Sequence, residues 1–211
     1  MDRRTLLLGD WSPVVRDGID LLRIAILLGA AGFALAGDRG GALVLAALGG
    51  LTLIARALNL PRVYDLCFTA AMALQGFGEA FALYDSFVRF DDLVHFTLPL
   101  LTAPVAYIAL ARADVVPDPR DETHLPHYVG IFVITLALGT ALGAVWEIVE
   151  WRSDAWLGSD LSINNDDTVG DLVRDTLGSA VGAGLLVVWA RWGWGSVRRV
   201  PGVNTYEDVD A

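Results

Sequence analysis

The sequence predicts an all-α integral membrane protein, a bundle of about six membrane-spanning helices. The chain of 211 residues is 55% hydrophobic and has a mean hydropathy of +0.51, more apolar than a soluble domain of this length. Only 19% of its residues are charged, and they gather between long apolar runs. Each run approaches the length of about 20 residues that a helix needs to cross the hydrocarbon core.

Clusters rich in glycine, proline and charge separate the apolar runs and set their ends. The first three runs end at GDRGG, NLPR and YDSFVRFDD, and the next two end at RADVVPDPRDETHLPH and SDAWLGSDLSINNDDTVGD. The runs form one domain, 21–192, between an N-terminal arm at 1–20 and an acidic tail at 193–211 that we expect to be disordered. The predicted spans are 21–36, 42–58, 63–83, 93–111, 128–151 and 172–192.

The arginines near the span ends predict an orientation in the cell membrane. They are concentrated in the N-terminal arm, the second and fourth connections between spans, and the C-terminal tail. Both termini are therefore expected in the cytoplasm. The starts of the fourth and sixth spans are then expected on the outer side.

The net charge of −10 excludes a nucleic-acid-binding protein, which would need a basic face. Membrane lipids are the partners that this composition implies. The oligomeric state is left open.

Ionisable residues gather at the predicted outer ends of the last four spans. Residues three or four positions apart share one face of a helix, as Asp91 does with His95 in FDDLVHF and Glu147 does with Glu150 in WEIVEW. Acidic residues also enter the last span at every fourth position. The ionisable residues of these ends are Glu79, Asp91, Asp92, His95, Glu147, Glu150, Asp167, Asp171, Arg174 and Asp175.

Ionisable groups inside a membrane normally face a partner, a cavity or the bundle interior. The carboxylates can share protons, pair with Arg174, Arg89 or Arg152, or surround a divalent cation. Carboxylates with one imidazole suit manganese, iron or zinc, and carboxylates alone suit magnesium or calcium. The candidate metal ligands are Asp91, His95, Glu147, Glu150, Asp171 and Asp175.

Simpler structural roles compete with a metal site. Glu150 can pair with Arg152 or face water, and a lone buried histidine such as His95 is more often a hydrogen-bonded packing residue than a ligand. Glu147 and Asp175 lie deeper, where neither capping nor solvation explains them. Aspartates at a helix start can act as N-caps, and the candidates for that role are Asp91, Asp92, Asp167 and Asp171.

The stretches FDDLVHF, WEIVEW and NNDDTVGDLVRDTLGSAVGA, in this order, resemble the YjdF-like family of uncharacterised inner-membrane proteins. They are also similar to VanZ-like membrane proteins, which tend to have Asn at the position of Asp175 and Gln at that of Glu150. Both differences favour the YjdF-like family, although that family usually has Gln-Gly-Asp where this chain has Val169-Gly170-Asp171. The resemblance covers about 79–183 and implies a shared polar site without naming its chemistry. The matching residues are Asp91, His95, Glu147, Glu150, Asp167, Asp171, Asp175 and Gly178.

Three functions are compatible with these observations. The first is a metal-dependent enzyme acting on a lipid or lipid-linked head group at the outer leaflet. In that enzyme Glu147 or Asp175 would be the general base, and Arg174 would hold a phosphate.

The second function is an ion or small-solute transporter. Asp65, Arg56 and Arg23 lie near the expected inner side, but the apolar stretch between them and the outer residues does not fit a site near the midplane. The third is a non-catalytic membrane factor whose acidic residues hold a structural cation or fix helix packing.

Overall fold

The computed structural model describes residues 15, 17–58, 60–120, 124–157 and 164–192. These residues form helices and no strand, which confirms the all-α prediction. Helix α5 is a single turn, and the other helices are long. The elements are α2 (Gly18–Leu35), α3 (Arg39–Ala57), α4 (Arg62–Ala80), α5 (Leu83–Ser86), α6 (Phe90–Arg112), α7 (Leu125–Leu157) and α8 (Asn165–Trp192).

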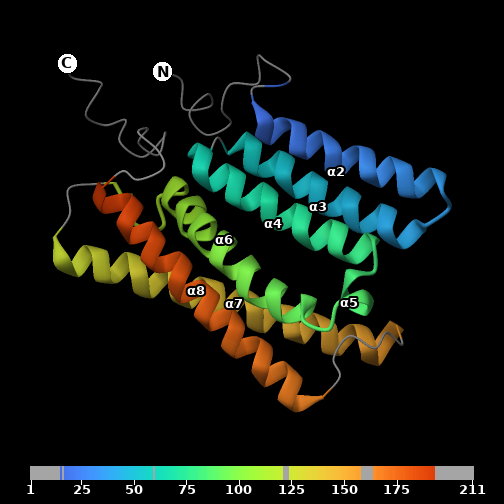
Figure 1. The fold of residues 1–211 in the computed structure, drawn as a ribbon. Helices are drawn as coiled ribbons and strands as arrows, with labels where there is room; N and C mark the ends of the chain where they lie inside the picture. Colours follow the sequence, from blue (N-terminus) through green and yellow to red (C-terminus); the bar gives the residue numbers. More distant parts are fainter. Residues whose placement is uncertain (1–14, 16, 59, 121–123, 158–163, 193–211) are drawn as a thin grey trace.

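The long helices form two groups (Figure 1). Helices α2, α3 and α4 lie side by side in one group, and α6, α7 and α8 pack together in the other. Helix α4 joins the groups because it packs against α2 and α3 and also against α6. A buried apolar core extends along this junction, where the rings of Tyr64 and Trp189 meet edge to face at 5.2 Å.

Five of these helices are long and apolar enough to cross a membrane: α2, α3, α6, α7 and α8. The remaining predicted span, 63–83, corresponds to α4, a helix of 19 residues that is not among the five. Its buried residues include Asp65, Thr69 and Gln75. Polar side chains are tolerated at these positions because α4 faces other helices on several sides.

Glycines let the second group pack closely. A Cβ atom at Gly178 or Gly182 of α8 would overlap the backbone of α6 at Phe96 or Leu100. Small residues at this spacing allow helix backbones to approach in lipid. Helix α6 therefore packs closely against the face of α8 that also carries Asp171 and Asp175.

The helix boundaries differ from the predicted ones mainly in the last two helices. Helix α7 continues past Trp151 to Leu157, and α8 begins at Asn165, about two turns before the predicted start. Residues 152–157 and 165–170 therefore extend these helices, although polar composition placed them in a loop. Residues 158–163 and 193–211, and nearly all of 1–16, lie outside the described residues, so the expectations for the arm and tail stay predictions, as does the membrane orientation.

A buried ionic group, the balanced tetrad, joins α2, α3 and α4. Its members are between 2% and 5% exposed. Arg23 donates to Asp20 Oδ1 at 2.6 Å, to Asp65 Oδ1, and to the carbonyl of Thr52 at 3.2 Å. Arg56 donates to Asp20 Oδ1 at 3.0 Å, so two arginines offset two aspartates. The tetrad consists of Asp20, Arg23, Arg56 and Asp65.

Candidate metal centre

Three helices bring the predicted metal ligands together. Helix α6 contributes from its first two turns, α7 from near its C-terminal end, and α8 from its second and third turns. These residues approach one another at one end of the bundle, opposite the balanced tetrad along the direction of α4. The acidic cluster, as we call this group, consists of Asp91, His95, Glu147, Glu150, Asp171 and Asp175.

His95 lies at the centre of the acidic cluster and is 5% exposed. Its Nε2 atom is 3.5 Å from Asp91 Oδ1 on the same helix. Its Nδ1 atom is 3.3 Å from Asp175 Oδ1 and 3.7 Å from Glu147 Oε1. The two ring nitrogens therefore face different carboxylates, an arrangement that fits both a metal ligand and a hydrogen-bonded packing residue.

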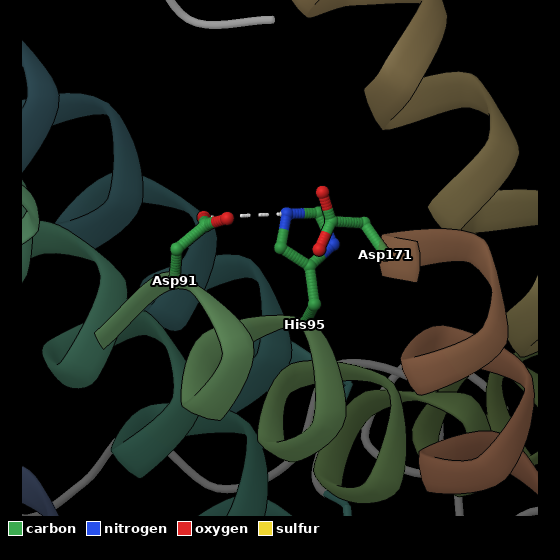
Figure 2. Close-up of side chains that lie close together, drawn as sticks. All are labelled: Asp91, His95 and Asp171. Carbon is green, nitrogen blue, oxygen red and sulfur yellow. Dashed lines mark ion pairs between the residues drawn. The ribbon is translucent and has the colours of Figure 1, made fainter. Parts of the chain in front are cut away.

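Two sets of three residues have ligand atoms within 4.8 Å of one another, and both include His95. Figure 2 shows the first set, in which Asp171 reaches from α8 toward the His95 ring while Asp91 comes from α6. The second set is His95 with Glu147 and Glu150. Ligands on opposite sides of a transition-metal ion are separated by roughly 4 to 4.5 Å, because each bond is about 2.0 to 2.2 Å long. The spacing of either set thus suits one cation.

Two carboxylate oxygens in the acidic cluster are buried without a hydrogen-bond partner among the described residues. These atoms are Glu147 Oε1 and Asp175 Oδ2, on side chains that belong to residues 7% and 2% exposed. A buried acceptor that lacks a donor loses its hydration without compensation, at about 1 to 3 kcal/mol. A cation held by the second set would compensate Glu147, whereas Asp175 belongs to neither set.

The packing of α7 against α8 places Asp175 against His95. A Cβ atom at Gly143 of α7 would overlap the Asp175 carboxyl group. Glycine at this position leaves room for the buried carboxylate between the two helices. The spacing of Gly139 and Gly143, typical of close helix packing in membranes, thus serves the site as well as the fold.

Arg174 and Asp92 form a rim at the edge of the acidic cluster. Arg174 Nη2 is 2.7 Å from Asp92 Oδ1, and its Nη1 is 2.8 Å from Asp171 Oδ1. The side chains of Arg174 and Asp92 are 34% and 43% exposed, whereas that of Asp171 is 4% exposed. Cluster and rim together hold six carboxyl groups against one guanidinium and one imidazole, so the site has a surplus of negative charge.

The structure corrects the capping alternatives. Asp91 and Asp92 lie in the first turn of α6, whose N-cap position is Arg89 and has no side-chain capping bond. At α8, Asn164 Oδ1 accepts hydrogen bonds from the backbone N–H groups of Asp166 and Asp167, at 2.9 and 3.1 Å. None of the four aspartates proposed as caps therefore holds that position. Asp171 lies further inside α8 and contributes to the site.

Other predicted neighbours of the site have separate roles. Glu79 is exposed at the end of α4. The guanidinium of Arg152 lies over the ring of Trp156 at 3.5 Å, which explains its position without the proposed pairing with Glu150.

One residue beside the acidic cluster was absent from the sequence prediction. The hydroxyl of Tyr84, in α5, donates to Gln75 Oε1 at 2.7 Å. Burial raises the pKa of Tyr84, and the nearby charges of Asp91 and Glu150 raise it further, so this hydroxyl keeps its proton. Helical periodicity gave no signal for Tyr84 because it lies in a single turn between two long helices.

The family model for predicted membrane proteins called DUF2238 matches residues 22–192, which covers all the site residues named above. No curated protein and no solved structure matches the chain. The YjdF-like resemblance corresponds to this family, whereas the VanZ-like similarity is not shown. The chain therefore belongs to the DUF2238, or YjdF-like, family of predicted membrane proteins.

Proposed function

We propose that this protein is a divalent-cation-dependent membrane enzyme that acts on a lipid or lipid-linked head group. The observation that carries the proposal is the arrangement around His95. One ring nitrogen contacts the buried Asp175, and the other faces a carboxylate at the edge of the site. Two buried carboxylate oxygens, Glu147 Oε1 and Asp175 Oδ2, have no hydrogen-bond partner among the described residues.

The contacts of His95 favour one position for the cation. A histidine that binds a metal commonly donates its other N–H to a carboxylate, which fixes the tautomer and the ring orientation. Asp175 Oδ1, 3.3 Å from Nδ1, can accept that N–H. The Nε2 lone pair is then directed toward the side of the ring where Asp91 lies, and a cation there would be held by Asp91, His95 and Asp171.

Glu147 is the group best placed to act as a general base. It is buried, and its Oε1 lies 3.7 Å from His95 Nδ1 without a hydrogen-bond partner in the described part of the chain. A bound divalent cation would lower the pKa of a coordinated water. Glu147 could accept the proton of that water as it attacks a substrate, with Glu150 beside it on the same face of α7.

The position of the acidic cluster supports a head-group substrate. It lies at the ends of apolar helices, and its outer members, Asp91 and Asp92, are partly exposed while His95 is buried. On the face of α8 that points away from the cluster, Val169, Val173 and Leu177 are more than half exposed. That apolar face suits lipid tails, so a head group at the same depth would reach the cluster without leaving the bilayer surface.

The cation is tested first, on the full chain purified in detergent. We expect bound Mn²⁺ to show a histidine nitrogen signal in electron spin echo spectra that is lost in His95→Ala. The double variant His124→Ala/His127→Ala removes the other two histidines of the chain and should keep the signal. Metal-free protein, or full binding by His95→Ala, would rule out this centre.

The reaction is tested in cells by comparing lipid profiles. Glu147→Ala should change the amount of at least one membrane lipid, whereas Glu79→Ala, on the exposed end of α4, should not. Unchanged profiles in Glu147→Ala and in Asp175→Ala would argue against an enzyme. Cluster-dependent Mn²⁺ flux into liposomes would instead establish a transporter.

A further inference from the structure

Arg174 is the basic side chain at the rim of the acidic cluster. Its guanidinium joins two helices, because it contacts Asp92 of α6 and Asp171 of α8 at 2.7 and 2.8 Å. It is one-third exposed, while Asp171 behind it is almost fully buried. The guanidinium therefore lies between the outside and the buried ligands.

The position of this guanidinium depends on the absence of a side chain one turn earlier. A Cβ atom at Gly170 would lie 2.8 Å from Arg174 Nη1. The Arg174 side chain thus extends back over Gly170, toward the N-terminal end of α8, as side chains on a helix tend to do. A larger residue at 170 would require the guanidinium to shift.

We infer that the substrate carries a phosphate group and that Arg174 binds it. The inference rests on the proposed function, because a cation held by Asp171 would compete with Arg174 for that carboxylate. Arg174 Nη1 would then be released toward the outside. A guanidinium presents parallel N–H donors that match two phosphate oxygens, and a third oxygen would face the cation.

The charges of the rim distinguish a phosphate from other head groups. A quaternary ammonium is recognised by a cage of aromatic rings, whereas the described rim residues are a guanidinium and a carboxylate. An anionic group could not approach six carboxyl groups without a cation and an arginine to offset them. The negative surplus and the single guanidinium therefore suit a phosphate that arrives together with, or after, the divalent cation.

The probes are a phosphate-bearing lipid and its matched analogues. The full chain, purified in a phosphate-free maltoside detergent and loaded with Mn²⁺, is titrated with dihexanoyl phosphatidic acid. Dihexanoylglycerol lacks the phosphate, and glycerol 3-phosphate lacks the acyl chains. Phosphorus NMR line broadening by Mn²⁺ reports whether the phosphate reaches the cation.

We expect wild-type protein to broaden the phosphatidic acid signal and to show no competition from dihexanoylglycerol. Arg174→Gln should weaken phosphatidic acid binding by about tenfold or more, since charge-assisted hydrogen bonds are lost, with Mn²⁺ binding retained. The phosphatidic acid affinity of Arg174→Lys should lie between those of the wild type and Arg174→Gln. Arg152→Gln, which alters a guanidinium stacked on Trp156, is the matched control and should match wild type.

The outcomes separate this inference from the proposed function. If the wild-type protein binds no Mn²⁺, the proposed function itself is contradicted. If the wild type binds Mn²⁺ but Arg174→Gln binds phosphatidic acid with the same affinity as wild type, only the role of Arg174 is overturned. Loss of Mn²⁺ binding in Arg174→Gln would have the same consequence. Equal affinity for glycerol 3-phosphate would keep the phosphate and replace the lipid by a soluble phosphate ester.

Discussion

The balanced tetrad and the acidic cluster are two buried ionic groups that differ in charge balance: the first is neutral and the second has an excess of carboxylates. In the balanced tetrad, two arginines contact two aspartates and a backbone carbonyl. In the acidic cluster, carboxylates outnumber cations, and two buried oxygens lack a hydrogen-bond partner among the described residues. Burial alone therefore does not distinguish the two groups, but charge balance does.

This difference separates a structural role from a binding role. Charges in a membrane are stable when they are paired and hydrogen-bonded, and the arginines and aspartates of the tetrad pair with one another. Among the described residues the acidic cluster does not satisfy this condition, and a cation would offset part of its negative charge. We therefore expect mutations in the tetrad to lower the free energy of unfolding, and mutations in the cluster to weaken ligand binding.

The largest effect is expected from breaking the balanced tetrad. Arg23→Gln removes the buried guanidinium that contacts both Asp20 and Asp65, which should lower the free energy of unfolding by about 3 to 5 kcal/mol. Thermal unfolding in detergent measures this change. Arg62→Gln is the matched control, because Arg62 pairs with Asp17 at 2.9 Å but is 69% exposed, and it should shift stability by less than about 1 kcal/mol. Equal losses in the two variants would contradict the assigned role of the tetrad.

The next largest effect is stabilisation by the cation. Mn²⁺ at about one hundred times its dissociation constant should stabilise wild-type protein by about 2.7 kcal/mol, and a chelator should reverse this. His95→Ala should abolish the gain. Any tetrad variant that still folds should keep the stabilisation by Mn²⁺, since the tetrad lies at the other end of α4. If the tetrad variant lost this stabilisation as His95→Ala does, the two groups would be coupled.

A smaller effect is expected from filling the space beside Asp175. Gly143→Ala places a Cβ atom where the Asp175 carboxyl lies, so we expect a loss of about 1 to 3 kcal/mol from overpacking together with weaker Mn²⁺ binding. Gly130→Ala, also in α7, adds a Cβ atom with nothing within 4 Å. That control should be neutral or gain up to about 1 kcal/mol from helix propensity. Unimpaired Mn²⁺ binding by Gly143→Ala would show that the position of Asp175 does not matter.

The smallest effect is expected from neutralising one carboxylate in each group, which should change the stability of the protein in opposite directions. In metal-free protein, Glu147→Gln should raise stability by about 1 kcal/mol, because it removes one of several buried like charges. Asp65→Asn should lower stability, because Arg23 loses an ionised partner. Unfolding midpoints with a chelator present compare them, and destabilisation by Glu147→Gln would assign the acidic cluster a structural role as well.

Much of the fold followed from the sequence, because apolar length alone marks a membrane helix. The exception is α4, which was predicted as a span but is not among the five helices apolar enough to cross a membrane. Its polar residues, such as Asp65 and Gln75, depend on neighbours in other helices, which hydropathy does not record. The early start of α8 was also missed, since Asn165 and Asp166 resemble loop residues although Asn164 caps the helix there.

Helix spacing and chain direction predicted which residues share a helix face and which helix ends lie at the same end of the bundle. Asp91 and His95, four positions apart, had to share a face, and the direction of the spans brought α7 and α8 to the same end. Spacing within one helix could not show that Asp175 and Arg174 take separate partners in α6. Nor could it show that Asp20 completes the balanced tetrad, because an acidic residue in the first turn of a helix has an ordinary explanation in the helix dipole.

The Asp20–Arg23 pair also bears on how the protein is made. The two residues lie three positions apart in α2 and contact each other at 2.6 Å, whereas Asp65 follows Arg23 by 42 positions. When the ribosome has delivered only α2 to the membrane insertion machinery, the charge of Arg23 is already offset within its own helix. We therefore expect α2 to need no residue of α4 to offset the charge of Arg23 as it enters the bilayer, and in the folded protein the contact with Asp65 joins α2 to α4.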